Sequence, residues 1–292
     1  MSQPTVAVLG TGTMGAGMAQ SLLREGFRVK AWNRTTAKLK PLVAAGAEAA
    51  GSVAEAAQDA EHVITMLFDA AAVREVTGEI TANLRPGAVW LQCSTVGQQA
   101  MVDLTRQVGD SVRLVDAPVL GTKQPAEQGK LVVLASGPGD AIEAAAPIIN
   151  AIGSRLVVVG ETVGQASALK LVCNSWLATL TAGAAQSLAL AESLALDPAL
   201  FLEAIKGGSQ DAPYLQRKGA QMIARDYSTG FSVAAALKDV RLAQEASAAA
   251  GVPTELVEAL VALLQRASET GDGGDDIAAV RRAFDGPTGP TG

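Results

Sequence analysis

The fold of this chain is decided by the stretch Val6-Ala7-Val8-Leu9-Gly10-Thr11-Gly12-Thr13-Met14-Gly15. A short apolar run with β-branched residues predicts a buried strand, and the residues from Ala16 to Arg24 predict a helix. The glycines between them form the pattern G-x-G-x-x-G. Gly10 permits the tight turn, Gly12 lets a pyrophosphate approach the backbone, and Gly15 lets helix and strand pack closely. We therefore predict a dinucleotide site here, with the phosphates at the helix N-terminus, where free N–H groups favour negative charge.

The second predicted strand indicates which dinucleotide is bound. NAD-preferring sites usually end this strand with an Asp or Glu that takes the ribose 2′-OH. Here the strand is followed by neutral Asn33, cationic Arg34 and the hydroxyl of Thr35. A guanidinium grips a 2′-phosphate with two hydrogen bonds, whereas a carboxylate would repel it. This predicts NADPH (NADP+) as the cofactor. The alternative is that Arg34 is an ordinary solvated surface residue.

The composition excludes several classes of protein. Among 292 residues, 49% are apolar but only 3% are aromatic, so Ala, Val, Leu and Ile must build the core. The net charge is −6 and there is no basic tract, which argues against nucleic-acid binding and against adhesion to an anionic membrane. No stretch has the length of a membrane span or the character of a signal peptide. The two cysteines, Cys93 and Cys173, lack metal-ligand spacing, so we expect no metal site and a cytoplasmic location.

Strand and helix patterns alternate through the first half of the chain, and helices follow. The predicted strands are 5–9, 29–32, 62–67, 88–92, 113–117, 131–136 and 155–159, with helices at 36–45, 53–58, 70–77 and 98–108 between them. This is the pattern of an α/β Rossmann domain with a doubly wound parallel sheet. We predict an NADP-binding domain over 1–162, an all-α substrate and dimerisation domain over 163–285, and a disordered tail over 286–292.

The second half opens with a long helix predicted over residues 163–196. Ala, Leu and Val cover most of its faces, and a helix of this kind is usually buried. One small helical domain cannot cover so much apolar surface, so we expect a homodimer that packs the two C-terminal domains together. Further helices are predicted over 198–207, 214–224, 232–251, 254–270 and 276–284.

Hydride transfer to or from a nicotinamide needs a group that moves the matching proton. The single histidine, His62, begins a strand, whereas ligands bind at the carboxyl ends of such strands, so we interpret it as structural. Tyr214 and Lys218 have the Y-x-x-x-K spacing of short-chain dehydrogenases. We interpret that spacing as coincidental, because those enzymes space their glycines differently and carry the pair in the nucleotide domain.

A lysine at the start of the long helix is the better candidate. Lys170 and Asn174 are four residues apart and share one helix face, both polar among apolar neighbours. Apolar surroundings disfavour the charged form of an amine, which prepares it to hand a proton to a developing alkoxide. The same pattern fits a lysine whose ammonium simply reaches solvent past its apolar neighbours.

Three further segments, taken with the glycine motif, carry a family resemblance. They are Asp116-Ala117-Pro118-Val119-Leu120-Gly121-Thr122, the run from Gly164 to Asn174, and Phe231-Ser232-Val233 through Leu237-Lys238-Asp239. With them the chain resembles, over nearly its whole length, the β-hydroxyacid dehydrogenases, relatives of 3-hydroxyisobutyrate and 6-phosphogluconate dehydrogenases. Within that family, Lys123-Gln124-Pro125-Ala126-Glu127-Gln128-Gly129-Lys130-Leu131 looks most like the glyoxylate and succinic semialdehyde reductases.

The resemblance implies a role for each matching residue. Lys170 would be the general acid, Asn174 would orient it or the substrate, and Asp239 would position Lys170 or its network. Thr95 would lie by the nicotinamide and substrate, Phe231 would wall the pocket, and Lys238 would touch the cofactor. The expected cofactor site is Gly10, Thr11, Gly12, Thr13, Met14, Gly15, Asn33, Arg34, Thr35, Met66, Leu67, Thr95 and Lys238. The expected substrate site is Thr95, Leu120, Gly121, Thr122, Lys170, Asn174 and Phe231.

One residue departs from the family pattern. After Asp-Ala-Pro-Val the family usually has a serine that helps to hold the substrate carboxylate, and this chain has Leu120. Backbone N–H groups of Gly121 and Thr122, or the side chains of Thr122 and Lys123, remain to bind an anion. Leu120 nevertheless removes a hydroxyl and adds apolar bulk, which favours a larger or less polar carbonyl compound over glyoxylate.

Three functions are compatible with these features. The first is an NADPH-dependent reductase of small aldehyde or keto acids, or the same reaction run toward oxidation. The second is an imine reductase of related fold; Lys170 argues against it, because those enzymes usually carry Asp or Tyr there. The third is a non-catalytic NADPH-binding module, which would be free to lose Lys170, Asn174 and Asp239.

Overall fold

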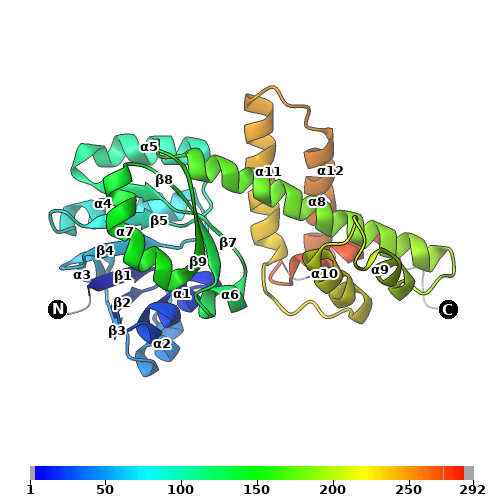
Figure 1. Cartoon of the computed structure of the whole chain (residues 1–292), viewed down its shortest axis with the longest axis horizontal. Coiled ribbons are helices and arrows are strands. Elements are labelled where there is room, and N and C mark those ends of the chain that lie inside the picture. Colours follow the sequence, from blue (N-terminus) through cyan, green and yellow to red (C-terminus); the bar gives the residue numbers. More distant parts are fainter. Residues whose placement is uncertain (1–3, 272, 286–292) are drawn as a thin grey trace. The chain divides into compact units, whose positions relative to one another are not determined.

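The computed structural model describes residues 4–271 and 273–285, so the tail expected at 286–292 lies outside the described residues. The chain divides into two compact units, the first ending at Lys170 and the second beginning at Leu171. A sheet flanked by helices forms the first unit, and the second is helical throughout its described part (Figure 1). Among the described residues, no helix is long and apolar enough to cross a membrane.

Nine strands and the helices between them make up the first unit. The strands are β1 (Thr5–Leu9), β2 (Arg28–Trp32), β3 (Glu48–Ala49), β4 (His62–Thr65), β5 (Val89–Gln92), β6 (Arg113–Asp116), β7 (Val119–Leu120), β8 (Leu131–Ser136) and β9 (Gly153–Gly160). The helices are α1 (Thr13–Arg24), η1 (Thr36–Leu39), α2 (Lys40–Ala44), α3 (Val53–Ala57), α4 (Ala70–Asn83), α5 (Gln98–Val108), η2 (Gly109–Ser111), α6 (Lys123–Glu127) and α7 (Gly139–Ile152).

The strand order places the glycine motif at a reversal of the winding. The order is β3-β2-β1-β4-β5-β6-β8-β7, with β9 pairing β8, and all pairs from β3 to β6 are parallel. From β1 the chain winds outward to β2 and β3, then returns to β4 on the other side of β1. Ligands of such sheets bind outside the carboxyl ends of the strands at this point. The predicted Rossmann-like domain, followed by a helical one, is confirmed.

The sheet is not parallel throughout, which differs from the prediction. β8 runs antiparallel to β6 and to β7. Only residues 121–130 join β7 to β8, and a parallel crossover needs a dozen or more residues. Several elements escaped prediction. β3 and β7 are strands of two residues and carry no readable alternation. Two helices contain a proline, which in sequence indicates a break: Pro125 in α6 and Pro147 in α7.

Alternate side chains of each strand build two separate cores, one on each face of the sheet. Val6 and Val8 of β1 belong to a buried cluster with residues of α1 and α7, such as Met18 and Ile148. Ala7 and Leu9 face the opposite way and join a cluster with residues of α4 and α5, including Val76, Ile80, Met101 and Leu104. Because successive strand residues point to opposite faces, the apolar run of β1 is buried on both sides.

The second unit is a bundle built largely from small apolar residues. Its helices are α8 (Gln165–Ser193), α9 (Ala199–Ile205), α10 (Pro213–Ala224), α11 (Val233–Ala249), α12 (Glu255–Glu269) and the 3-10 helix η3 (Ile277–Phe284). α8 begins in the first unit and continues into the second. The core of the bundle includes Leu188, Val240, Leu264 and Val280, all at most 2% exposed.

Candidate active site

The glycine motif has the backbone that close approach of a pyrophosphate requires. Gly10 has a φ of +97°, and a Cβ there would collide with the Met66 carbonyl oxygen. A Cβ on Gly15 would collide with the carbonyl oxygen of Gly10. Gly12 differs, because a Cβ there would meet nothing within 4 Å. The protein itself leaves room for a side chain at Gly12, which fits a position kept clear for a bound phosphate.

Helix α1 begins at this loop without a side-chain cap. Its N-cap residue is Gly12, which has no side chain to accept a hydrogen bond from the first turn. The buried hydroxyl oxygen of Thr11 has no hydrogen-bond partner. Free backbone N–H groups and the positive end of the helix dipole favour an anion at this place. The loop therefore fits the phosphates of a dinucleotide, with Thr13 and Met14 supplying first-turn N–H groups.

The end of β2 carries the predicted determinants of cofactor choice. Arg34 and Thr35 are exposed, while the Asn33 side-chain amide donates to the Thr35 carbonyl oxygen at 3.2 Å and so shapes the turn. A mostly apolar cavity of about 500 Å³ opens directly after them, lined by Thr36, Leu39, Lys40, Val43, Ala44, Ala49, Ala50 and Gly51. Lys38, an exposed cation in η1, is a further candidate that the sequence analysis missed; its spacing of four from Arg34 could have indicated it.

A buried polar network joins the carboxyl ends of β4 and β5. The Trp90 indole donates to Thr65 Oγ1 at 3.0 Å, and Thr65 Oγ1 donates to Gln92 Oε1 at 3.2 Å. Gln92 Oε1 accepts from the Ser94 amide at 2.8 Å, and Ser94 Oγ accepts from the Leu67 amide at 2.9 Å. Buried polar groups with satisfied partners hold one geometry. The network therefore fixes the segments that carry Met66 and Leu67 on one side and half-buried Thr95 on the other.

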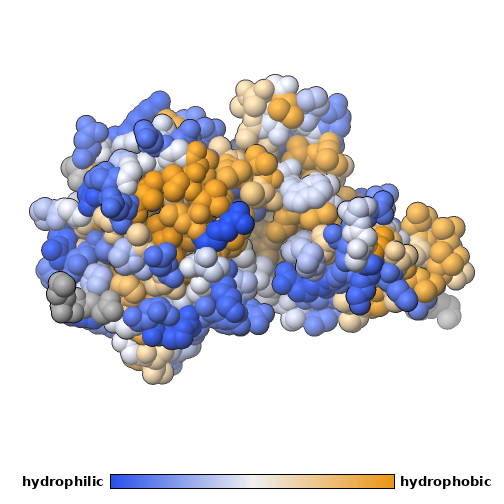
Figure 2. All heavy atoms as spheres, in the orientation of Figure 1, coloured by the Kyte–Doolittle hydropathy of each residue, from blue (hydrophilic) through white to orange (hydrophobic). Residues whose placement is uncertain are grey.

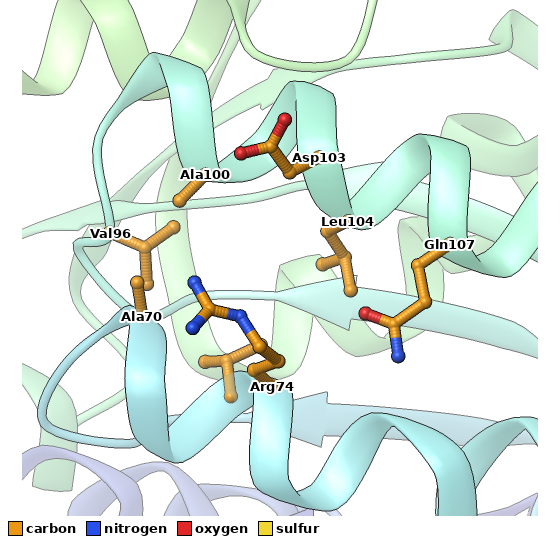
Figure 3. A pocket seen from close by; sticks show the side chains of 8 residues that line it. Ala70, Arg74, Val96, Ala100, Asp103, Leu104 and Gln107 are labelled. Atoms are coloured by element: carbon orange, nitrogen blue, oxygen red, sulfur yellow. The ribbon is translucent and has the colours of Figure 1, made fainter.

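A small cavity lies beside this edge, between α4 and α5. Figure 3 shows the Arg74 side chain of α4 reaching into it, with Asp103 and Gln107 of α5 and several apolar side chains in the lining. Its lining is Ala70, Val73, Arg74, Val96, Ala100, Asp103, Leu104 and Gln107, and its volume is about 30 Å³. That space holds about one water molecule, so it is not a substrate pocket.

Asp116, at the end of β6, connects this strand by hydrogen bonds to the beginning of α8. Its buried carboxylate accepts from the amides of Gly164 at 3.0 Å and Ser167 at 2.8 Å, and from the hydroxyls of Ser167 at 2.7 Å and Ser136 at 3.3 Å. Burial raises the pKa of Asp116, and these four hydrogen bonds oppose that rise. A carboxylate at a helix N-terminus is favoured by the helix dipole. In the sequence, Asp116 stands out only as the first residue of the motif that runs to Thr122.

Lys170 lies in the second turn of α8, next to the predicted substrate segment. Its half-buried ammonium donates to the Val119 carbonyl oxygen at 2.8 Å. Val119 immediately precedes Leu120, and Gly121 follows with a φ of +134°. Leu120 and Thr122 are half-buried, whereas Gly121 is exposed. Within the first unit, Lys170 therefore lies next to the Leu120–Thr122 segment. The two were expected to belong to the same substrate site, and this placement is compatible with that.

In the second unit, Asp239 holds two of the other predicted residues. Its Oδ2 accepts from the Asn174 side-chain amide at 2.6 Å, and its Oδ1 lies 2.6 Å from Lys238 Nζ. Asn174 and Asp239 are buried, and Lys238 is 19% exposed at its side chain. Asn174 lies four residues beyond Lys170 on the same continuous helix, α8. Half-buried Phe231 directly precedes Ser232, whose hydroxyl caps α11, the helix that carries Lys238 and Asp239.

The remaining titratable candidates have other surroundings. His62 begins β4, its Nε2 lies 3.1 Å from the Ala144 carbonyl oxygen, and burial lowers its pKa. Burial raises the pKa of the Cys93 thiol, which disfavours the reactive thiolate. Tyr214 and Lys218 lie on α10 in the helical unit. The described residues contain no group of three or more acidic, His or Cys side chains that could hold a metal ion.

Comparison with known proteins gives the same assignment for the whole chain. Residues 5–160 match the NAD-binding domain of 6-phosphogluconate dehydrogenase, and 164–284 match the NAD-binding family of NADP-dependent 3-hydroxyisobutyrate dehydrogenase. The chain is 33% identical to glyoxylate/succinic semialdehyde reductase 2 of Arabidopsis thaliana, over 96% of this chain and 79% of that protein. It is 30% identical to the NAD-dependent L-serine dehydrogenase of Pseudomonas aeruginosa, over 96% and 97% of the two chains.

Solved structures agree. A crystal structure of 3-hydroxyisobutyrate dehydrogenase from Salmonella typhimurium superposes with a TM-score of 0.86 at 26% identity, covering 96% of this chain and 99% of that one. The family matches and the fold together cover nearly the whole chain. The predicted resemblance is confirmed: the chain belongs to the β-hydroxyacid dehydrogenases, a family of NAD(P)-dependent oxidoreductases.

Proposed function

We propose that this enzyme uses NADPH to reduce the carbonyl group of a small aldehyde or keto acid to the hydroxy acid, and runs the reverse reaction with NADP+. The observation that carries the proposal is the ammonium of Lys170, held at 2.8 Å by the Val119 carbonyl oxygen beside the Leu120–Thr122 segment. Relatives named glyoxylate/succinic semialdehyde reductase, 33% and 30% identical, support this substrate class.

Lys170 acts as the general acid in this proposal. The nicotinamide, when bound, supplies the hydride. As negative charge develops on the carbonyl oxygen, Lys170 Nζ donates a proton to it, and in the reverse direction the neutral amine takes that proton back. The hydrogen bond to Val119 restricts a side chain that is otherwise long and mobile. It thereby lowers the entropy that is lost when the proton donor is aligned.

The proton transfer from Lys170 is supported by three further residues, Asn174, Asp239 and Lys238. The amide of Asn174 is held by Asp239 Oδ2, which leaves its carbonyl oxygen to accept a hydrogen bond from the substrate or from Lys170. Lys238 is held at Asp239 Oδ1, where it contributes positive charge for the cofactor. One carboxylate thus orients two side chains that have separate tasks.

The preference for NADPH rests on the end of β2. Arg34 pairs with the 2′-phosphate, and the Thr35 hydroxyl adds a donor. No acidic side chain follows β2 to repel the phosphate, since the next residues are Asn33, Arg34, Thr35 and Thr36. The glycine loop, Met66, Leu67 and Thr95 bind the remainder of the dinucleotide in this proposal.

Leu120 shapes the choice of substrate. The substrate carboxylate meets backbone N–H groups of Gly121 and Thr122 instead of a serine hydroxyl. The Leu120 side chain takes the place of that hydroxyl and favours a substrate with a longer apolar chain. Succinic semialdehyde therefore fits better than glyoxylate, because its two methylene groups give Leu120 an apolar contact. Phe231 walls the pocket.

The proposal is tested by measuring NADPH consumption with succinic semialdehyde, glyoxylate, an uncharged aldehyde of similar length and a cyclic imine. We expect turnover of the aldehyde acids and none of the imine. Turnover of the imine alone would assign an imine reductase. Tight NADPH binding with no turnover of any compound in the panel would favour a binding module.

We also propose that residues 1–162 form the cofactor domain and that 163–285 pair with a second copy. The exposed leucines at the end of α8 and in the following segment support the second point: Leu190, Leu194, Leu196 and Leu200 are 52–62% exposed. Figure 2 shows hydrophobic residues gathered over this end of α8. Contiguous apolar surface of this kind usually marks an interface.

A further inference from the structure

The Tyr214–Lys218 pair of α10 has a structural task that its spacing alone did not indicate. Lys218 Nζ donates to Asp276 Oδ1 at 2.5 Å and to Gln221 Oε1 at 2.9 Å. The side chains of Lys218 and Asp276 are only 4% and 0% exposed. One turn earlier, the Tyr214 hydroxyl lies 3.2 Å from Thr181 Oγ1 on α8. The pair therefore anchors α10 at two points inside the bundle.

Asp276, the partner of Lys218, also binds the loop that precedes α11. Its Oδ2 accepts from the amides of Gly230 at 3.0 Å and Phe231 at 3.2 Å, while the Ala278 amide donates to Oδ1 at 3.0 Å. A backbone hydrogen bond joins the same two segments, because the Ile277 amide donates to the Phe231 carbonyl oxygen at 2.8 Å. Phe231 is thus held from both its amide and its carbonyl group.

The hydrogen bonds between Asp276 and this loop depend on the positive charge of Lys218. A carboxylate buried without a countercharge is strongly disfavoured and takes up a proton or turns toward solvent. Either change removes an acceptor from the amides of Gly230 and Phe231. Phe231 adjoins the cap of α11, so a looser loop also loosens the start of the helix that carries Lys238 and Asp239.

We propose that Lys218 and Asp276 are positioning residues that set the place of Phe231 and thereby the fit of the substrate chain. Both side chains are buried in the bundle, so they act through the backbone of Phe231. The inference rests on the proposed function, in which Phe231 walls the substrate pocket.

The test compares Lys218→Met with a matched control, Arg281→Met. Arg281 is also a buried cation of the same bundle, 3% exposed and paired with Glu192 and Asp285, but it makes no hydrogen bond to Gly230 or Phe231. Two quantities are measured on the full chain: hydrogen exchange at the Gly230 and Phe231 amides, and the kinetics with NADPH and succinic semialdehyde, scaled to the folded fraction.

We expect Lys218→Met to speed exchange at the two amides about tenfold or more, because their acceptor is lost. The KM for succinic semialdehyde should rise about tenfold with a smaller change in kcat, because the pocket wall is displaced while the proton donor is intact. The dissociation constant of NADPH should change less than the KM, because Lys238 stays paired with Asp239. Arg281→Met should lower thermal stability and leave the exchange and the KM near wild type. Lys218→Arg, which keeps the charge, should recover most of the KM.

Unchanged exchange at Gly230 and Phe231 in folded Lys218→Met would overturn the proposal. So would faster exchange with a KM no higher than that of Arg281→Met. If Lys218→Met does not fold, Asp276→Ala replaces it, because alanine has no side-chain acceptor for the Gly230 and Phe231 amides. A wild-type KM in that folded variant contradicts the proposal equally. Failure of the wild type to reduce the aldehyde would instead refute the proposed function, and the exchange data would still decide whether the pair holds the loop.

Discussion

The ammonium of Lys170 lies 2.8 Å from the carbonyl oxygen of Val119, to which it donates a hydrogen bond. Three residues before Val119, the carboxylate of Asp116 accepts from the amide of Gly164, just before α8, and from that of Ser167 in its first turn. One short segment therefore holds both the start of the helix and the lysine in its second turn. The position of Lys170 is set by the sheet as well as by its own helix.

Removing the ammonium should abolish turnover without affecting the dinucleotide. A lost general acid typically costs about 10²–10⁴-fold in rate, so we expect that loss in kcat for Lys170→Ala. The dissociation constant of NADPH, measured by fluorescence titration, should stay within a few-fold of wild type. Lys170→Arg should be nearly as inactive, because a guanidinium keeps its proton. Near-normal activity of either variant would remove Lys170 from the mechanism.

Arg34→Ala should weaken NADPH binding selectively. A hydrogen bond to a charged group contributes about 1.5–3 kcal/mol, so the dissociation constant of NADPH should rise roughly 10–100-fold while that of NADH barely changes. Arg28→Ala is the matched control, because Arg28 is an exposed arginine at the opposite end of the same strand. Better use of NADH than of NADPH by the wild type would contradict the role given to Arg34.

The raised pKa of Asp116 predicts how stability depends on pH. Burial is the main cause of the rise above 3.8, so the folded protein binds this proton more tightly than the unfolded chain. Stability should therefore fall as pH rises from about 4 to the raised pKa and stay lower above it. Asp116→Asn cannot titrate, and its amide and carbonyl groups can meet the same partners.

The measurement is urea unfolding of both proteins between pH 4 and 8. The variant should gain stability relative to wild type as pH rises, by about 1.4 kcal/mol for each unit of pKa shift. Asp211→Asn should show no such gain, since hydrogen bonds from Gly207 and Gln216 lower the pKa of Asp211 below 3.8 and leave it ionised over this whole range. A constant difference between wild type and Asp116→Asn over the whole range would count against this account.

Leu120→Ser should shift preference toward small acidic substrates. The new hydroxyl can donate one hydrogen bond to a carboxylate, worth roughly 1.5–3 kcal/mol, which should appear chiefly as a lower KM for glyoxylate. Activity on an uncharged aldehyde should fall. Leu120→Ala removes the bulk without adding a hydroxyl and separates the two effects. An unchanged ratio of kcat/KM for acidic and uncharged aldehydes would show that Leu120 does not tune the pocket.

Dimerisation should depend on the exposed leucines at the end of α8. Light scattering at micromolar concentration should give twice the mass of the 29.6 kDa chain. Leu194→Lys places a charge on a residue that is 62% exposed and should give a monomer without loss of helix content. Leu256→Lys on α12, a similarly exposed leucine, is the control and should stay dimeric. A monomeric wild type would refute the interface.

Local sequence was enough to predict the cofactor loop and the α/β class. The roles of Gly10, Gly12 and Gly15 follow from backbone sterics over six residues, and the apolar runs of the strands follow from burial on both faces. The same local information failed for β3, β7 and α7. Two-residue strands have no period to detect, and Pro147 lies inside a helix that tertiary packing stabilises.

Only the tertiary structure decided which polar residues meet. Asp116 and Ser167 are 51 residues apart in sequence, Asn174 and Asp239 are 65 apart, and Lys218 and Asp276 are 58 apart. No periodicity connects such positions, because their pairing depends on how sheets and helices pack and not on local backbone preference. The sequence determined the glycine turn, the α/β class and a lysine placed to donate a proton. The packing of distant elements decided which partner each polar residue has. Val119 binds the lysine, Asp239 binds Asn174, and the buried ion pair of Lys218 and Asp276 holds the loop before α11.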